Sequence, residues 1–556
     1  MNRRHFLQLG GATLSSLLVS SATTAFAAGP TRVQLPAKVH VRLDDGLHEL
    51  RPTDARQSWS YQDVVVTLQP TQDALRVLVH APGRALHAVQ LQWPYAPPTG
   101  ATVLGDAWER TYGDLAFRAP TFERKLPWYF VQQEPHHTTC FGVKTGCNSM
   151  AYWQVGAGTL QLTLDTESGG VGVQLGTRTL SAAEIVTTQR QEPEDTFATV
   201  RRFCGLLCPA PRLPQQPVYG INDWYFAYGN NSASLILDHT AMLAELVTST
   251  DNRPFSVIDA GWATYAPTLP GDGGWQDDFT RPNPKFGDME KLAGQITRLG
   301  MRPGLWTRPL CAAHDTARNR LLPAIAGRDD PRQPVLDPTI PENLAHVEHL
   351  FQTYRAWQYE LVKHDFTTYD LLGRWGPAMT DRLTPAGWRF YDNTRTTAEI
   401  ITQLYQAIRK AAGPTYLLGC NTVSHLSAGQ FELCRTGDDT SGQEWARTPK
   451  MGVNTLGFRL VQHNRFYAVD GDCVGLTTKI PWAKNKQWLH LLAESGSPLF
   501  ISAQKEALGT AQKEAIRQSF AQAASVQPVG EPLDWLTTPW PTRWRLNGQV
   551  QTFDWT

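Results

Sequence analysis

The chain has 556 residues, more than a single hydrophobic core normally supports, so its length predicts two or three domains. Hydrophobic residues make up 41% of the sequence and charged residues 18%, as is typical of a globular protein. Lysine plus arginine and aspartate plus glutamate are equal at 51 each, so the composition disfavours a nucleic-acid partner.

The first 27 residues have the pattern of an export signal. Arg3 and Arg4 precede an apolar stretch over 9–22 and a small-residue cleavage motif at 25–27. The twin arginines resemble a bacterial Tat signal, so we expect a periplasmic or secreted mature protein. A retained anchor is disfavoured because the apolar run is too short to cross a bilayer, and no other stretch approaches the length of a membrane span.

Eight cysteines are few for a chain of this size, so any disulfides would add to stability rather than replace a core. Cys140 with Cys147, and Cys204 with Cys208, are near enough in sequence to form two local bridges, but the pairing stays open. No cysteine and histidine set has the spacing of a zinc site. We therefore expect no metal and no cofactor.

After the signal, short β-type runs separated by turns predict an antiparallel β-sandwich, which we assign to residues 28–207. The expected strands are Lys38–Leu43, Val64–Leu68, Leu75–Val79, Val89–Trp93, Thr159–Leu164 and Gly170–Leu175. A proline-rich connector over 208–217 then marks a domain boundary, because proline stiffens the chain and cannot extend a β-ladder.

From 218 to 524 the pattern changes to strand, polar loop and amphipathic helix, repeated, which predicts parallel β/α architecture. Eight strands are expected, the number that closes a TIM barrel. They are Val218–Trp224, Phe255–Asp259, Arg302–Trp306, Tyr359–Asp365, Tyr416–Cys420, Leu433–Gly437, Phe466–Asp470 and Pro498–Ser502. Helices between them are expected over Ser234–Val247, Asp288–Leu299, Glu342–Tyr354 and Thr396–Ala412.

Residues 525–556 are expected to form a small C-terminal β unit, because Arg543–Phe553 alternates apolar and polar residues as a strand does. The sequence leaves open whether this unit closes on the barrel or stands apart. The predicted fold is therefore a multidomain α/β plus β protein, with a central (β/α)8 TIM barrel, an N-terminal antiparallel β-sandwich and a small C-terminal β unit.

Polar side chains collect at the ends of the expected barrel strands, where a TIM barrel forms its active site. Five of the eight strands end at or beside an aspartate, and isolated buried carboxylates are costly, so these residues must face a polar cavity or a partner. The aspartates are Asp223, Asp259, Asp365, the pair Asp438 and Asp439, and the pair Asp470 and Asp472.

Four short motifs fall on consecutive strands of the expected barrel. They are Lys363-His364-Asp365-Phe366, Gly419-Cys420, Arg435-Thr436-Gly437-Asp438-Asp439-Thr440 and Asp470-Gly471-Asp472-Cys473. In this order they resemble motifs of the α-galactosidase clan of glycoside hydrolases, most closely family 36 and more distantly family 27. The resemblance covers essentially the whole barrel and implies a retaining, exo-acting α-glycosidase that hydrolyses terminal α-galactosides or related α-glycosides. Its partner would be an oligosaccharide or glycoconjugate substrate.

The resemblance implies that Asp365 is the nucleophile and Asp439 the acid/base. A retaining glycosidase needs two carboxyl groups about 5 to 5.5 Å apart, which strands four and six can supply across the barrel mouth. Lys363 is expected to keep the surroundings of Asp365 positive so that this carboxylate stays ionised. Asp439 would need a raised pKa, which burial and nearby carboxylates would provide, and Arg435 would orient the sugar.

Three residues keep alternative interpretations. Asp438 is the other candidate for the acid/base, because relatives differ in the spacing that selects this residue. Cys420 is explained as well by a buried apolar position as by contact with the sugar. Asp472 is interpreted as structural, holding a loop by hydrogen bonds.

The chain contains 19 tryptophans, and indole rings stack on the apolar faces of sugars as well as filling cores. Trp224, Trp275 and Trp306 lie near strand ends, where each can stack on a sugar or plug the barrel mouth. Position favours the first two as substrate-binding residues. The full expected substrate-binding set is Trp224, Asp259, Trp275, Lys363, Cys420, Arg435 and Asp438.

One position departs from the family pattern. Relatives usually have two aspartates after strand two, which are thought to grip hydroxyl groups at C4 and C6 of galactose, whereas this chain has Asp259-Ala260. A hydroxyl without a partner in a closed pocket costs roughly 1 to 3 kcal/mol. Either an aspartate of the 272–278 loop takes this place, or the sugar is not plain galactose.

Two other functions stay open. An α-galactosyl transglycosidase would need a pocket that excludes water from the glycosyl-enzyme, and a non-catalytic carbohydrate-binding barrel would keep the fold without turnover. The joint presence of Lys363, Asp365, Arg435 and Asp439 argues against the binding-only alternative. Ala260 favours an altered specificity.

Overall fold

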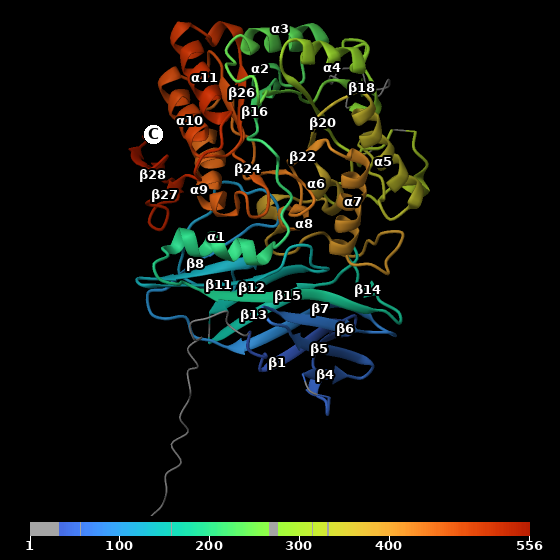
Figure 1. Cartoon of the computed structure of the whole chain (residues 1–556). Coiled ribbons are helices and arrows are strands. Elements are labelled where there is room, and N and C mark those ends of the chain that lie inside the picture. The colour runs from blue at the N-terminus through green and yellow to red at the C-terminus, as the bar shows by residue number, and fades with distance from the viewer. Residues whose placement is uncertain (1–32, 56, 157, 266–275, 314, 331–332) are drawn as a thin grey trace, which may run out of the picture.

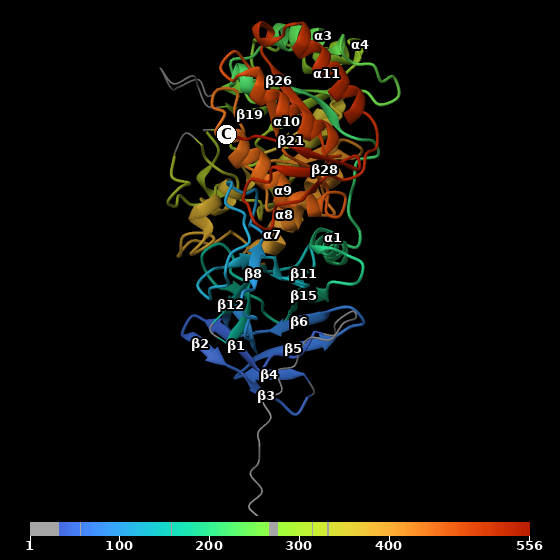
Figure 2. The same ribbon diagram turned by 90° about the vertical axis from the view of Figure 1, so that its left-hand side faces the viewer.

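A computed structural model of the chain describes residues 33–55, 57–156, 158–265, 276–313, 315–330 and 333–556 (Figure 1). The expected signal segment 1–27 and Trp275 lie outside these residues. Antiparallel sheets occupy one end of the molecule and the barrel occupies the other, so that the molecule is elongated (Figure 2).

The N-terminal part consists of antiparallel strands, as predicted. Their bounds are β1 Lys38–Leu43, β2 Gly46–Glu49, β3 Arg51–Pro52, β4 Ser58–Tyr61, β5 Val64–Pro70, β6 Leu75–His80, β7 Ala85–Pro94, β8 Thr102–Gly105, β9 Leu126–Pro127, β10 Tyr129–Glu134, β11 His137–Val143, β12 Met150–Gly156, β13 Thr159–Asp165, β14 Val173–Gln174 and β15 Thr179–Gln189. One sheet has the order β2-β1-β7-β13-β12-β9 with β14 on β7, and the other has the order β3-β4-β5-β6-β15-β11-β10-β8. Strand β6 alternates buried and half-buried residues, as a strand that covers a core with one face does.

Five of the six strands expected here coincide with β1, β5, β6, β7 and β13. The sixth, Gly170–Leu175, is wrong in extent, because only the two residues of β14 pair with β7. Its first residue packs against the barrel domain instead: Gly170 N donates to the Trp388 carbonyl at 2.8 Å, and a Cβ at Gly170 would lie 2.2 Å from the Pro385 carbonyl oxygen. This tight contact between domains has no signal in the local sequence.

The parallel sheet forms a TIM-like barrel, as predicted. Its strands are β16 Tyr219–Asn222, β17 Phe255–Ile258, β20 Arg302–Thr307, β21 Leu361–His364, β22 Tyr416–Gly419, β23 Leu433–Arg435, β24 Ala468–Asp470, β25 Cys473–Leu476 and β26 Leu499–Ala503. The sheet order is β24-β23-β22-β21-β20-β17-β16-β26-β25. Each of the eight expected strands overlaps one of these. The ninth arises because the seventh position is split: β24 pairs with β23, β25 pairs with β26, and only Gly471 and Asp472 separate them.

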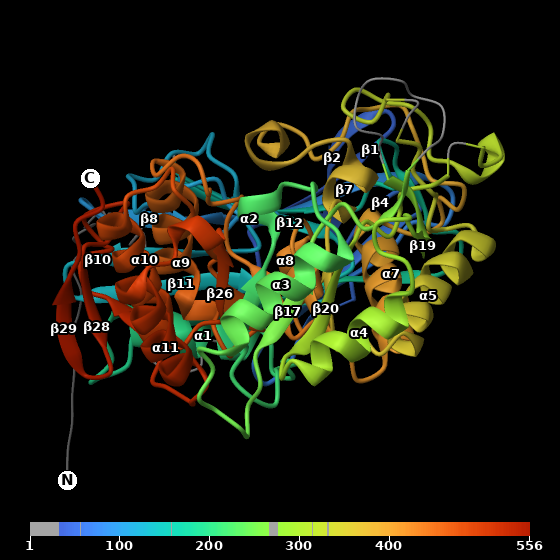
Figure 3. The same cartoon turned by 90° about the horizontal axis from the view of Figure 1, so that it is seen from above.

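Helices cover the outside of the barrel (Figure 1). Their bounds are α1 Thr196–Leu207, α2 Trp224–Ala227, α3 Ala233–Ala244, α4 Met289–Arg298, α5 Pro341–Ala356, α6 Thr367–Leu372, α7 Thr397–Ala412, α8 Ser424–Ser427, α9 Thr455–Arg459, α10 Trp482–Glu494 and α11 Thr510–Ala523. The four expected helices coincide with α3, α4, α5 and α7, and a capping box between Thr396 and Glu399 starts α7. Figure 3 shows α3, α4 and α11 on the side of the barrel that faces away from the N-terminal sheets. Helix α1, which joins the two parts, was not predicted.

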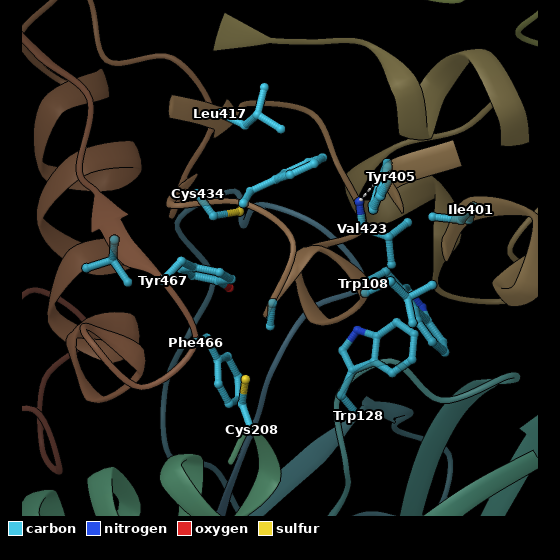
Figure 4. Packing of buried hydrophobic residues seen from close by; sticks show 14 of the residues in the cluster. Trp108, Trp128, Cys208, Ile401, Tyr405, Leu417, Val423, Cys434, Phe466 and Tyr467 are labelled. Carbon is cyan, nitrogen blue, oxygen red and sulfur yellow. Dashed lines mark hydrogen bonds between the residues drawn. The ribbon is translucent and has the colours of Figure 1, made fainter. Parts of the chain in front are cut away.

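A continuous apolar core joins the barrel to the N-terminal sheets (Figure 4). Trp128 stacks on His425 of α8 with ring centroids 4.8 Å apart, and Trp108 meets Trp128 edge-on at 5.2 Å. On the barrel side, Val423 N donates to the Tyr405 hydroxyl at 3.0 Å. Because the two parts share one packed core, the chain beside Trp108 is held in a fixed position against the barrel.

The C-terminal strands, β27 Glu531–Pro532, β28 Arg543–Leu546 and β29 Gln549–Thr552, form the small sheet that was predicted. This unit closes on the barrel rather than standing apart. Trp445 Nε1 donates to the Trp555 carbonyl at 3.2 Å, and Gln487 Nε2 of α10 donates to the Asp554 carbonyl at 2.8 Å.

All eight cysteines are buried free thiols, so neither of the two local bridges considered above is formed. Among the residues that the structure describes, no helix is both long enough and apolar enough to cross a membrane.

Candidate active site

Side chains from strands that are not neighbours in the barrel meet at the carboxyl ends of the strands. Lys363 of β21 binds Asp259, the residue after β17, with Nζ 2.7 Å from Oδ2. Trp224, which begins α2 directly after β16 and Asp223, donates from Nε1 to Oδ2 of Asp439, beyond β23, at 3.2 Å. Strands β16 and β23 are not neighbours in the sheet order, so this bond crosses the barrel mouth and brings the predicted site residues into one place.

Asp365 follows β21, and two N–H groups fix its carboxylate. Trp306 Nε1, at the end of β20, donates to Oδ2 at 3.0 Å, and Phe366 N donates to Oδ1 at 2.8 Å. Phe366 has φ 64°, a left-handed conformation that a bulky residue rarely adopts, so the turn after Asp365 is strained. Trp306 is only 7% exposed; it therefore plugs the barrel mouth and also orients the carboxylate of Asp365.

Lys363 forms its ion pair with Asp259 rather than with Asp365. Burial by itself lowers the pKa of the Lys363 ammonium, but the charge of Asp259 raises this pKa well above its ordinary value, so the lysine stays charged. Asp259 also accepts hydrogen bonds from Asn222 Nδ2 and from Ala260 N, both at 2.8 Å. Lys363 and Asp259 thus form a fixed, charge-balanced pair in the floor of the site.

Asp439 is held by Trp224 and by Arg435, whose Nη2 lies 3.3 Å from Oδ1. Burial by itself raises the pKa of Asp439, but the charges of Arg435, Arg110 and Lys363 lower it below its ordinary value. The predicted raised pKa of Asp439 is therefore wrong. The neighbouring carboxylates that were expected to raise it are themselves paired with cations.

Asp438 is committed to two arginines. Its Oδ1 lies 2.9 Å from Arg110 Nη2, and its Oδ2 lies 3.0 Å from Arg447 Nη2. Its backbone N–H donates to the Thr111 carbonyl at 2.9 Å. Both carboxylate oxygens are therefore engaged in ion pairs, which favours Asp439 over Asp438 as the group that exchanges a proton with substrate.

Arg435 is buried among acidic residues. Its Nη2 lies 2.8 Å from Asp472 Oδ2, and its Nη1 donates to the sulfur of Cys420 at 3.7 Å. Asp472 also accepts from Thr440 N at 2.8 Å, which agrees with its interpretation as the holder of a loop. Burial, followed by the charge of Asp365, raises the pKa of the Cys420 thiol, so Cys420 is a neutral, buried part of the site floor.

Three site residues were not predicted as such. Burial and the charge of Asp259 raise the pKa of Asp223 to about 7, and its carboxylate accepts from Asp259 N at 2.7 Å. Burial raises the pKa of Glu109 to about 7 as well. Glu109 and Arg110 come from the N-terminal part of the chain, and no local pattern marks them; only Asp223, at a strand end, had a signal in the sequence.

Asp278 of the 272–278 loop does not replace the missing second carboxylate after strand two. Asp278 accepts hydrogen bonds from Thr280 N at 2.9 Å and from Arg281 Nε at 2.7 Å, so its carboxylate is used within its own strand, β19 (Gln276–Pro282). Asp272 and the side chain of Asp277 lie outside what the structure describes. Among the described side chains of this loop, the acceptor lost at Ala260 stays unreplaced.

These features define a barrel with a glycosidase-like fold and antiparallel N-terminal sheets. Over most of the chain it matches solved structures of GH36 α-galactosidases, at low sequence identity. The α-galactosidase from Thermus thermophilus, solved with p-nitrophenyl α-D-galactopyranoside, is 19% identical and matches with a TM-score of 0.59 over 93% of this chain and 99% of that one. A variant of the GH36 α-galactosidase from Geobacillus stearothermophilus, solved with raffinose, is 15% identical and matches with a TM-score of 0.60 over 94% of this chain and 80% of that one.

The α-galactosidase from Lactobacillus brevis is 14% identical and matches with a TM-score of 0.56, covering 89% of this chain and 74% of that one. At these identities the likeness shows the fold alone. No protein-family model matches the sequence, and no curated protein matches it either.

Proposed function

We propose that the protein is a retaining, exo-acting α-glycosidase that hydrolyses terminal α-galactosides or related α-glycosides. The observation that carries the proposal is a pair of indole N–H groups at the barrel mouth, from the ends of β20 and β16, each bonded to one of the two predicted catalytic carboxylates. The shared fold supports it, because the relatives of that fold are α-galactosidases solved with p-nitrophenyl α-D-galactopyranoside, raffinose and stachyose.

In the proposed first step, a carboxylate oxygen of Asp365 bonds to the anomeric carbon, and the bond from that carbon to the leaving oxygen breaks. Asp439 gives its proton to the leaving oxygen, which departs as a hydroxyl group. In the second step Asp439 takes a proton from water, the water oxygen bonds to the anomeric carbon, and the ester to Asp365 breaks. Two inversions give net retention.

The charges around Asp439 set the pH range of this reaction. Asp439 must be protonated in the first step, and Arg435 lowers its pKa. The protonated fraction of Asp439 therefore falls as the pH rises through the acidic range, so we expect turnover of substrates with poor leaving groups to be fastest at acidic pH.

Ala260 bears on the sugar that the site accepts. The carboxylate of Asp259 is already shared among Asn222, Lys363 and Ala260 N, so it alone cannot replace two acceptors. We propose that the site tolerates sugars that lack a hydroxyl group there, such as a β-L-arabinopyranoside, which has no C6. Action in the periplasm or outside the cell is proposed from residues 1–27 alone; a Tat-deficient host should then retain the unprocessed chain.

Turnover of aryl α-galactoside, α-N-acetylgalactosaminide and β-L-arabinopyranoside tests the function. Asp365→Ala should abolish turnover while leaving the thermal unfolding temperature close to that of the wild type, and azide should restore it with an inverted glycosyl azide as product. Asp439→Ala should spare an activated aryl leaving group more than a sugar leaving group, and Asp438→Asn is the matched control.

A near-native rate for Asp365→Ala would disprove the assignment of Asp365 as the nucleophile. Equal losses on both leaving groups for Asp439→Ala would move the acid/base role to Asp438. Glycosyl transfer that exceeds hydrolysis would make the protein a transglycosidase, and no turnover of any glycoside would favour a binding protein.

A further inference from the structure

A segment of the N-terminal part enters the barrel's active site. Residues 106–112, which follow β8, lie along the end of β23: Thr111 N donates to the Thr436 carbonyl at 2.9 Å, and Asp438 N donates to the Thr111 carbonyl at 2.9 Å. In Figure 2 this light-blue chain rises from the sheets to the barrel. A buried ion pair between Asp106 and Arg459, at 2.8 Å, anchors its start.

Two residues of this segment fix the loop that carries Trp375. Gly376 N donates to Glu109 Oε1 at 2.9 Å, and the Tyr112 hydroxyl donates to the same oxygen at 2.6 Å. A Cβ at Gly376 would lie 2.5 Å from the Tyr112 ring, and Gly376 has φ 50°, so the loop and the tyrosine are in direct contact. The position of Trp375 is therefore determined by the N-terminal part.

The indole of Trp375 packs on the residue that follows the predicted nucleophile. Its ring packs on Tyr369 at 4.7 Å between centroids and on Phe366, the residue after Asp365, at 6.0 Å. Trp375 keeps 37% of its surface exposed, although Tyr369 and Phe366 pack on its ring. An exposed ring that packs on the residue after the predicted nucleophile is suited to stack on the apolar face of a sugar.

Arg110 connects this indole to the other catalytic side of the site. Its guanidinium carbon lies 5.6 Å from the centre of the Trp375 ring, and its Nη2 binds Asp438 at 2.9 Å, next to Asp439. Arg110 is only 7% exposed, so its geometry is fixed. Trp375 and Arg110 thus span the gap between the end of β21, which carries the nucleophile, and the end of β23, which carries the acid/base.

We propose that Trp375, supported by Tyr369 and Phe366 and bordered by Arg110, is the subsite for the leaving group, and that it takes a neutral hexose ring of an oligosaccharide. The proposal rests on the proposed function, because a leaving group exists only if the glycoside is cleaved. It makes the N-terminal part a component of the active site: Glu109 and Tyr112 are positioning residues that act through the loop of Trp375.

The test compares two substrates that differ in the leaving group. Raffinose carries a sugar there, and α-galactosyl fluoride carries a single atom that cannot reach an indole. We expect Trp375→Ala to lower kcat/KM for raffinose about tenfold more than for the fluoride, with an intermediate effect for Trp375→Phe. Trp540→Ala removes another exposed tryptophan, 49% exposed and in the C-terminal unit, and should lower neither value.

If Trp375→Ala lowers kcat/KM equally for both substrates, or does not lower it for raffinose, the proposed subsite is overturned. If the wild type cleaves no glycoside, the proposed function fails, and calorimetry then tests the subsite separately. Raffinose binding by Asp365→Asn should weaken about tenfold when Trp375→Ala is added. Unchanged binding, or no raffinose binding by Asp365→Asn, would overturn the subsite.

Discussion

The bond from Trp224 to Asp439 gives the sharpest test of the proposed acid/base. Trp224 Nε1 donates to Asp439 Oδ2 at 3.2 Å, and a hydrogen bond to a carboxylate favours its ionised form. Trp224→Phe keeps an aromatic ring but removes the donor. The pKa of Asp439 should therefore rise, and the group should stay protonated to a higher pH.

The size of the effect follows from the geometry. A hydrogen bond to a charged group contributes about 1.5 to 3 kcal/mol to stability. The side chain of Asp439 is 36% exposed and the bond is long, so solvent screening reduces this contribution to about 1 kcal/mol. Since about 1.4 kcal/mol corresponds to one pH unit, the alkaline limb of the pH profile should move up by about 0.7 pH unit.

The assay is the pH dependence of kcat/KM for raffinose, whose poor leaving group requires a protonated acid. Trp306→Phe is the matched control, because it removes the same kind of donor from Asp365 and should leave the alkaline limb in place. A limb that does not move in Trp224→Phe, or that moves equally in Trp306→Phe, would refute the assignment of Asp439.

Two further variants test the surroundings of the site. Burial raises the pKa of Asp223 from 3.8 to about 7, so between these pH values the folded protein keeps a proton that the unfolded chain has lost, and the stability of the fold should fall as the pH rises through this range. The thermal unfolding temperature of Asp223→Asn should therefore fall less than that of the wild type over the same range. Equal pH dependence of the two unfolding temperatures would refute the raised pKa. Ala260→Asp should raise the ratio of kcat/KM for α-galactoside to kcat/KM for β-L-arabinopyranoside about tenfold, since a hydrogen bond to a charged group contributes about 1.5 kcal/mol or more. An unchanged ratio would show that position 260 does not contact the sugar.

The barrel was predictable because its strands have a strong local signal. Buried parallel strands appear as short apolar runs, such as Tyr416–Gly419, in which all four residues are buried. The split seventh strand was not predictable. Asp472 has φ 77° and breaks the ladder between β24 and β25, and its conformation is held by Arg435 and Thr440 from another strand end.

The sequence predicted which side chains gather at the strand ends but not their electrostatics. Motif order selected Asp365, Asp439, Lys363 and Arg435 as candidates, yet the state of Asp439 depends on which cations surround it. Arg110 is one of them, and it reaches Cys420 across 310 positions of the chain. A contact of that range has no periodic signal, so neither the lowered pKa of Asp439 nor the entry of the N-terminal segment follows from the sequence.

The ion pairs at the strand ends distinguish Asp365 from most of the neighbouring aspartates; Asp223 also has none among the residues that the structure describes, but burial and the charge of Asp259 raise its pKa to about 7. Asp259 pairs with Lys363, Asp438 with Arg110 and Arg447, and Asp439 and Asp472 with Arg435. Within the described part of the chain, Asp365 takes part in no ion pair and accepts only the N–H groups of Trp306 and Phe366. A nucleophile must keep its charge available for the anomeric carbon, and an ion pair would have to be broken before attack. Hydrogen bonds from neutral donors orient Asp365 without that cost, which is why the charge-balanced network around it supports the nucleophilic role of this residue.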